Sequence, residues 1–333
     1  MNREFQLIDR LTKKLPPVSK RVLLGIGDDA AVLKPSSGKT LLTVDCLVEG
    51  IHFDFSFCEP EEIGAKAMAV NASDIVAMGG KPIAALISLG VSSAVSEETL
   101  ERLYQGLADH SKTHSIDVVG GNITSSPERV MISISLLGEC SLEPVSRSGA
   151  KPGDVVFLSG PVGEAAAGLF LLKTKGQEAR TLFPKLTTHY LTPKIAVDFV
   201  NVLNRVNKVS SLIDISDGLS SELWHLAESS KVGFFIEEDK IPVSQELSEA
   251  AAKFRQNLRN WQFSGGEDYE LLGTIAPSDW PLLKKEAEGH GFILSEIGRV
   301  VPLERGLKLQ DRSGKEIPLE ATGWNHLSFS ERD

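Results

Sequence analysis

Six aspartates of this chain lie inside mostly apolar segments rather than in charged runs. They occur in LLGIGDDAAVL, TLLTVD, AMAVNASDIVAM and SLIDISDGL, as Asp28, Asp29, Asp45, Asp74, Asp214 and Asp217. A carboxylate that is buried without a partner is strongly disfavoured, or takes up a proton instead. These segments contain no Lys or Arg. The fold must therefore bring another partner to each carboxylate, and a bound divalent cation would meet that need.

Carboxylate oxygens are hard ligands, which favour Mg²⁺ or Ca²⁺ over zinc. The alternative is that these aspartates are helix caps and turn residues. Asp214 or Ser216, for example, could cap a helix that begins at Asp217. Asp74 fits this alternative less well, because it lies inside a predicted alanine-rich helix, away from both ends. The recurrence of the pattern in several segments favours metal binding.

The charge of the chain excludes one large class of partners. The 333 residues carry a formal net charge of −10. Nucleic-acid backbones are bound by clustered Lys and Arg, so we expect no nucleic-acid partner. A small phosphorylated ligand remains compatible with an acidic surface, because metal ions can supply the positive charge.

The cysteines and the hydropathy pattern indicate a compartment. Cys46, Cys58 and Cys140 form no CxxC pair, so three thiols in a reducing compartment are expected rather than a zinc site or disulfides. The N-terminus lacks the apolar run of a signal peptide, and no apolar run is long enough to span a membrane. We expect a cytoplasmic protein with no membrane partner.

Strand-like and helix-like segments alternate in both halves of the chain. The first half is predicted to contain helices at 4–14, 60–78 and 96–114 and strands at 30–34, 40–45, 83–90, 117–120 and 130–139, the first two forming a hairpin. The second half is predicted to contain strands at 154–159, 211–215, 233–236 and 271–275 and helices at 164–174, 176–192 and 216–229. The polar, Gly- and Pro-containing segment 141–153 between them is typical of a domain boundary. The pattern predicts an α+β sandwich (α/β sandwich) of two domains, 1–146 and 147–333.

Several longer motifs resemble a known family. They are GIGDDAAVL, VDCLVEGIHF, KAMAVNASDIVAMGG, DISDGL and SGGEDYEL. The chain resembles the thiamine-monophosphate kinases, within the wider group of aminoimidazole ribonucleotide synthetase and selenophosphate synthetase. The resemblance implies the two-domain fold of that group, with metal binding, ATP binding and homodimerisation in the N-terminal domain. It also implies an enzyme that uses ATP and several Mg²⁺ ions to convert thiamine monophosphate to thiamine diphosphate.

The resemblance also implies roles for residues at matching positions. Metal ions would be held by Asp29, Thr43, Val44 (through its backbone), Asp45, Asp74, Asn122, Asp214 and Asp217. ATP would contact Tyr104, Gly121, Asn122, Arg147 and Ser216, and thiamine monophosphate would contact His52, Glu267 and Trp324. No general base is assigned, because the attacking phosphate oxygen is already anionic. From the residues alone, Tyr104 could be helix packing, His52 a core histidine and Glu267 a helix cap.

One position departs from the family pattern. The family has Gly-Gly-Asp where this chain has Gly120, Gly121 and Asn122. An asparagine carbonyl can still bind Mg²⁺, but one negative charge is lost, which would weaken one metal position. The alternatives are another ATP-dependent synthetase of the same group and, because of Asn122, a non-catalytic protein that binds nucleotide or thiamine phosphate.

Overall fold

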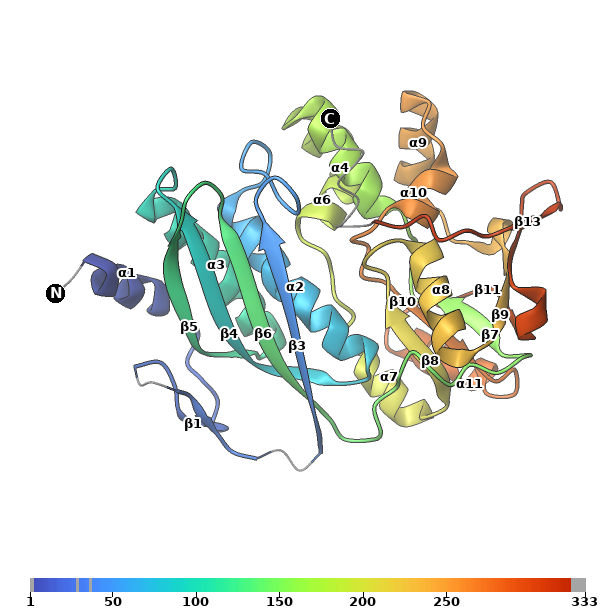
Figure 1. The fold of residues 1–333 in the computed structure, drawn as a ribbon, viewed down its shortest axis with the longest axis horizontal. Coiled ribbons are helices and arrows are strands. Elements are labelled where there is room, and N and C mark those ends of the chain that lie inside the picture. The colour runs from blue at the N-terminus through green and yellow to red at the C-terminus, as the bar shows by residue number, and fades with distance from the viewer. Residues whose placement is uncertain (1–2, 28–29, 36–37, 325–333) are drawn as a thin grey trace. The chain divides into compact units, whose positions relative to one another are not determined.

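The computed structural model describes residues 3–27, 30–35 and 38–324, without the side chains of 3–5 (Figure 1). The chain divides into two compact units. The first comprises Met1–Val76 and Gly80–Pro144, and the second comprises Ala77–Gly79 and Val145–Asp333. Each unit contains its own sheet and its own helices, so the expected α+β class is confirmed.

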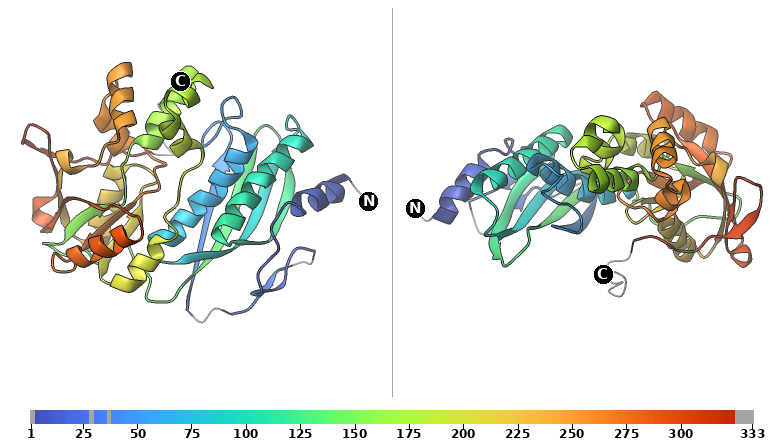
Figure 2. Two further views of the ribbon diagram at one scale, coloured as in Figure 1. Left: turned by 180° about the vertical axis from the view of Figure 1, so that it is seen from behind. Right: turned by 90° about the horizontal axis from the view of Figure 1, so that it is seen from above.

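The first unit is built on a four-stranded mixed sheet with the strand order β3-β6-β4-β5. These strands are β3 (Lys39–Val48), β4 (Lys81–Ser92), β5 (Asp117–Ser126) and β6 (Met131–Cys140). β4 and β5 are parallel, and β6 is antiparallel to both of its neighbours. Helices α2 (Pro60–Ala77) and α3 (Glu97–His114) cover one face of the sheet (Figure 1 and Figure 2). The short helix α1 (Arg3–Thr12) packs on α3.

Glycines allow α2 and α3 to approach each other closely. A Cβ atom at Gly64 would lie 2.0 Å from the carbonyl oxygen of Leu103, and one at Gly106 would lie 1.8 Å from that of Glu61. Only glycine is compatible with such contacts. Ser96, the first residue of the helix predicted at 96–114, accepts a backbone hydrogen bond and caps α3, with Glu97 and Glu98 in the first turn.

One predicted pairing in the first unit is wrong. The segment after residue 30 forms β2 (Val32–Leu33), which pairs with β1 (Val22–Leu24) and not with β3. β3 instead pairs with β6 over its full length. β3 and β6 form ten consecutive residue pairs, many more than the short predicted hairpin could form. This pairing also joins β3 to the rest of the sheet.

The second unit contains a seven-stranded mixed sheet with the order β13-β12-β9-β11-β7-β10-β8. Its strands are β7 (Val155–Leu158), β8 (Val209–Asp214), β9 (Gly233–Glu237), β10 (Leu271–Ile275), β11 (Ser295–Val301), β12 (Leu307–Gln310) and β13 (Glu316–Pro318). Its helices are α4 (Glu164–Lys175), α5 (Glu178–Leu182), α6 (Pro184–Leu191), α7 (Phe199–Val206), α8 (Leu219–Ser230), α9 (Gln245–Phe254), α10 (Leu258–Ser264) and α11 (Trp280–Gly289). Every residue of β7 and β10 is buried, so both faces of the central strands are covered.

Two predicted helices of the second unit differ in detail. The segment 176–192 forms two helices, because Pro184 occupies the first turn of α6 and starts a new helix there. The helix expected from residue 216 begins at Leu219 instead. Among the described residues, no helix is both long enough and apolar enough to cross a bilayer.

Candidate active site

In the first unit, side-chain hydrogen bonds connect the predicted metal ligands of β3 to α2. The hydroxyl of Thr43 donates to Oδ2 of Asp74 at 2.5 Å. The backbone N–H of Asp45 donates to Oδ1 of Asn71 at 2.9 Å. Because α2 ends at Ala77, Asp74 lies in the last helical turn, and the expectation that it lies away from both ends is wrong. The helix dipole disfavours a carboxylate there, so Asp74 needs an outside donor or a cation.

The loop after β3 orients His52 through the backbone. Its Nδ1 accepts a hydrogen bond from the N–H of Val48 at 3.1 Å. The carbonyl oxygen of His52 accepts one from Nζ of Lys66, a lysine that is only 2% exposed. With Nδ1 acting as acceptor, a neutral His52 carries its proton on Nε2. The ring is therefore held by its own loop, as in the core-histidine alternative.

A pocket of the first unit brings together three of the predicted ATP contacts. Tyr104, Gly121 and Asn122 line it, and the other lining residues are Ile8, Leu11, Thr12, Leu15, Ile26, Val118, Gly120 and Ile123. The walls are mainly apolar with a few polar groups, as in small-molecule sites. Tyr104 is 7% exposed, and burial raises the pKa of its hydroxyl to about 12, so it stays neutral. Tyr104 thus contributes both to helix packing and to the pocket wall.

An ion-pair cluster on the surface holds one wall of this pocket. Nε of Arg10 donates to Glu101 at 2.7 Å, and the same guanidinium pairs with Glu97. Both glutamates belong to α3, so Arg10 ties α1 to the helix that carries Tyr104. Arg147, another predicted ATP contact, lies in the second unit, where its backbone carbonyl accepts a hydrogen bond from the hydroxyl of Ser230 at 3.2 Å.

In the second unit, backbone hydrogen bonds join three segments that are far apart in the sequence. The N–H of Glu267 donates to the carbonyl oxygen of Ser216 at 2.8 Å. The N–H of Trp324 donates to the carbonyl oxygen of Asp217 at 3.0 Å. Asp214, 4% exposed, is the last residue of β8 and leads into the same loop. The structure therefore gathers the predicted site residues Asp214, Ser216, Asp217, Glu267 and Trp324 of this unit.

The start of α8 excludes the capping alternative for the aspartate loop. The N-cap of α8 is Gly218, with φ of 120°, and no side chain caps the helix there. Asp214 and Ser216 are thus not caps of this helix. Glu267 is not a helix cap either, because α10 ends at Ser264 and the backbone of Glu267 is left-handed, with φ of 68°.

Glu222, in the first turn of α8, is a part of this site that the sequence analysis missed. Its Oε1 accepts hydrogen bonds from the N–H groups of Asp217 at 2.9 Å and Ser216 at 3.3 Å. The side chain is 1% exposed, and burial raises its pKa to about 8. The backbone N–H of Asp217 opposes this shift, whereas the charges of Asp217 and Asp214 add to it. The available signal was a glutamate in the first turn of a predicted helix directly after DISDG.

The predicted metal ligands consist only of hard oxygen donors. Within the parts of the chain that the structure describes, no three His, Cys, Asp or Glu side chains are close enough together to hold a metal ion. Asp29 lies outside the described residues, so its role stays a prediction. The donor chemistry fits Mg²⁺, because hydroxyl, carbonyl and carboxylate oxygens are its usual protein ligands. Glu222 adds a buried oxygen, Oε2, that has no hydrogen-bond partner among the described residues.

Comparison with known proteins identifies the family. The model of the N-terminal domain of AIR synthase related proteins matches residues 27–140, and that of the C-terminal domain matches 151–307. The thiamine-monophosphate kinase of Bacillus subtilis (strain 168) is 36% identical, over 97% of this chain and 99% of its own length. This chain belongs to the thiamine-monophosphate kinase family. The family member of Aquifex aeolicus (strain VF5) is 39% identical, with 97% of this chain and 98% of that protein covered.

Solved structures agree with this assignment to the thiamine-monophosphate kinases. AaThiL complexed with AMPPCP and TMP matches with a TM-score of 0.78 and 38% identity, over 97% of this chain and 96% of that one. The hydrogenase maturation protein HypE in complex with ATP also gives a TM-score of 0.78, over 96% of this chain and 95% of that one. At 17% identity, HypE shares only the fold with this chain.

Proposed function

We propose that this protein transfers the γ-phosphoryl group of ATP to the phosphate of thiamine monophosphate, forming thiamine diphosphate and ADP. One observation carries the proposal. The likeness to thiamine-monophosphate kinases extends over nearly the whole chain, and one of the similar structures holds AMPPCP, an ATP analogue, together with TMP. The two alternatives, another synthetase and a non-catalytic homologue, are not favoured by this likeness.

ATP is proposed to place its base in the pocket beside Tyr104. The apolar side chains from α1 and β5 that line this pocket suit the faces of an aromatic base. Gly121 and Asn122 line the same pocket, so the nucleotide would lie against β5. Arg147 and Ser216 are proposed to contact the same nucleotide.

Several Mg²⁺ ions are proposed to accompany ATP. When bound, such ions neutralise phosphate charge and align the reacting groups. Thr43, Asp45 and Asp74 would hold metal in the first unit, together with the Val44 carbonyl, Asn122 and Asp29. Asp214 and Asp217 would do so in the second unit. Two features of the sequence support the proposal. These carboxylates lie in mostly apolar segments, and those segments contain no lysine or arginine.

Phosphoryl transfer to thiamine monophosphate requires the repulsion between two anionic phosphate groups to be reduced, and does not require a proton to be removed. The acceptor oxygen of thiamine monophosphate is anionic near neutral pH, so no residue has to act as a general base. Two unit negative charges 4 Å apart repel each other by about 4 kcal/mol at an effective dielectric constant near 20. The residues of this chain therefore act by positioning. Glu222 holds the N–H groups of Ser216 and Asp217, and this fixes the loop that carries the proposed ligands.

Thiamine monophosphate is proposed to contact His52, Glu267 and Trp324. Its thiazolium ring is cationic, and a carboxylate or an aromatic face attracts a cation. Glu267 and Trp324 lie on segments that bond to adjacent residues of one loop, Ser216 and Asp217. Trp324 is 48% exposed, which supports its access to a ligand.

A second copy of this chain is the proposed partner of the uncovered face of the first unit's sheet. Leu42, Val44, Leu86 and Met131 are exposed there, and Leu42 is 75% exposed. They belong to the neighbouring strands β3, β6 and β4. Exposed apolar side chains gathered on one face are typical of an interaction surface. We further propose a cytoplasmic location, where ATP is available and the three free thiols remain reduced.

The deciding experiment measures thiamine diphosphate formed from thiamine monophosphate, ATP and Mg²⁺. Aminoimidazole and selenide substrates serve as controls for the related synthetases. We expect thiamine diphosphate and ADP in equal amounts and no turnover of the control substrates. Tight binding of thiamine monophosphate without any turnover would identify a non-catalytic binding protein and contradict the proposal.

A further inference from the structure

The segment that carries Glu267 has an unusual backbone. Glu267 and Tyr269 both adopt the left-handed region, with φ of 68° and 53°. This conformation is disfavoured for residues other than glycine, so surrounding interactions must maintain it. The N–H groups of these two residues donate to the carbonyl oxygens of Ser216 and Ile215, both at 2.8 Å. The turn at 267–269 therefore sets the backbone of Glu267 directly against the aspartate loop.

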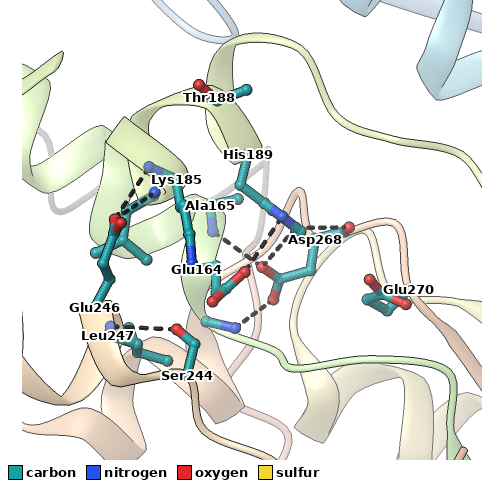
Figure 3. Close-up of polar contacts among 12 residues, drawn as sticks. Glu164, Ala165, Lys185, Thr188, His189, Ser244, Glu246, Leu247, Asp268 and Glu270 are labelled. Atoms are coloured by element: carbon teal, nitrogen blue, oxygen red, sulfur yellow. Dashed lines mark hydrogen bonds and ion pairs between the residues drawn. The ribbon is translucent and has the colours of Figure 1, made fainter. Parts of the chain in front are cut away.

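Asp268, between these two residues, anchors the turn to another element. Its Oδ2 accepts a hydrogen bond from the N–H of Gly163 at 2.6 Å, and its Oδ1 accepts one from that of Ala165 at 3.0 Å. These donors lie at the N-terminus of α4, where the helix dipole favours a carboxylate (Figure 3). The Asp268 side chain is fully buried. It has no access to a ligand in the surrounding solvent, so it acts on the site only through the backbone that it fixes.

His189 of α6 lies beside this anchor (Figure 3). Its Nε2 lies 3.2 Å from the carbonyl oxygen of Asp268, and its Nδ1 lies 3.4 Å from Oε2 of Glu164. α6 is itself fixed by Glu246 of α9, which accepts from the N–H of Lys185 at 3.0 Å. α4 and α6 thus meet the turn at Asp268, through its carboxylate and its carbonyl oxygen respectively, and α9 in turn holds α6.

We infer that Asp268 is a positioning residue, whose two hydrogen bonds to the start of α4 hold the left-handed turn and thereby place Glu267 for recognition of the cationic part of thiamine monophosphate. This inference rests on the proposed function for the identity of the ligand. The geometric part does not, because the contacts of Asp268 and the backbone of Glu267 are properties of the chain itself.

The test is a double-mutant cycle of Asp268→Asn and Glu267→Gln. Asparagine keeps the size of aspartate but offers one acceptor oxygen in place of two, so one anchor bond is lost. For Asp268→Asn we expect KM for thiamine monophosphate to rise about tenfold, with kcat and KM for ATP nearly unchanged. Because Asp268 acts through Glu267, the double variant is expected to match Glu267→Gln alone. Ser313→Ala, which removes an exposed hydrogen bond to Asp311 in a turn between β12 and β13, is the control and is expected to change none of these values.

Backbone amide exchange is measured on the same variants without any ligand. We expect the N–H groups of residues 267 and 269 to exchange faster in Asp268→Asn, with the exchange of α4 beyond its first turn unchanged. His189→Gln is expected to act in the same direction and replaces Asp268→Asn if that variant does not fold. Additive changes in KM, or unaltered exchange at 267 and 269, would overturn the inference. Absence of turnover in the wild type would contradict the proposed function alone, because exchange and the Kd for thiamine monophosphate still decide the role of Asp268.

Discussion

Oε1 of Glu222 lies 2.9 Å from the backbone nitrogen of Asp217 and accepts its hydrogen bond. A buried carboxylate therefore organises the backbone of a loop whose own side chains are proposed metal ligands. A local helix cap cannot explain this arrangement, because the helix that follows has glycine at its N-cap. The glutamate determines the course of the loop before any ligand binds.

Replacement of Glu222 by alanine is expected to impair both folding and turnover. The N–H groups of Ser216 and Asp217 would lose their acceptor in a buried site. Each buried donor left without an acceptor lowers the free energy of unfolding by roughly 1–3 kcal/mol. Glu222→Gln keeps an acceptor oxygen and is the matched control. Thermal unfolding and kcat are measured for both variants. A glutamine variant as impaired as the alanine variant would mean that the charge of Glu222, rather than its acceptor role, matters.

Replacement of Asp45 or Asp217 by alanine is expected to abolish turnover and to leave the fold largely intact. Loss of a proposed ligand carboxylate is expected to lower kcat/KM by roughly a hundredfold or more. Thiamine diphosphate formation is measured at saturating Mg²⁺, with circular dichroism to check folding. Asp198→Ala, at an exposed aspartate whose side chain caps no helix, is the control. Near-normal activity of either variant would remove that residue from the metal assignment.

Asn122→Asp tests the departure from the family pattern. Restoring the negative charge is expected to lower the Mg²⁺ concentration at half-maximal activity by about three- to tenfold, because a carboxylate binds Mg²⁺ more strongly than an amide carbonyl. Activity is measured across a Mg²⁺ titration. Ser125→Asp adds the same charge at an exposed position of β5 and is expected to cause no shift. Equal responses of the two variants would show that general charge, and not metal ligation at residue 122, causes the effect.

The stability of the second unit is expected to fall as pH rises from about 5 to 7, in part because of Glu270. Burial raises the pKa of its carboxyl from the ordinary 4.5 to about 7, and the Ser159 hydroxyl that donates to it only partly opposes the shift. Between these pH values Glu270 keeps its proton in the folded state but has lost it in the unfolded state. The free energy of unfolding therefore falls with rising pH, by at most about 3 kcal/mol at pH near 7. Thermal unfolding across this pH range is expected to show a shallower decline for Glu270→Gln. Glu178→Gln, at an exposed glutamate, is expected to follow the wild type.

Leu42→Lys tests the proposed homodimer. A charge on the uncovered face of the sheet would be buried in the interface, so we expect the variant to be monomeric under conditions in which the wild type is a dimer. Leu303→Lys changes another exposed leucine, in the second unit, and is expected to leave the assembly unchanged. Sedimentation velocity measures both. A monomeric wild type, or a dimeric Leu42→Lys variant, would contradict the proposed interface.

The local elements were predictable where short-range signals determine them. Ser96 with its following glutamates specified the start of α3. Pro184, which starts α6, was overlooked, and a single helix was predicted over 176–192. The hairpin after residue 30 was predicted wrongly, because turn residues cannot reveal that β3 has a longer partner in β6. The end of α2 was predicted within one residue, but Asp74 was described as lying away from it although it falls in the last helical turn.

By itself, the sequence determined the α+β class, most helices and strands of the first half, and the motifs that place this chain among the thiamine-monophosphate kinases. Only the tertiary structure decided that residues 216, 217, 267 and 324 share one hydrogen-bonded junction, and that Glu222 and Asp268 hold it. The physical reason is range. Helix caps and apolar periodicity act between near neighbours, whereas the partners of a buried carboxylate or a strained turn depend on which distant segments the sheet brings together.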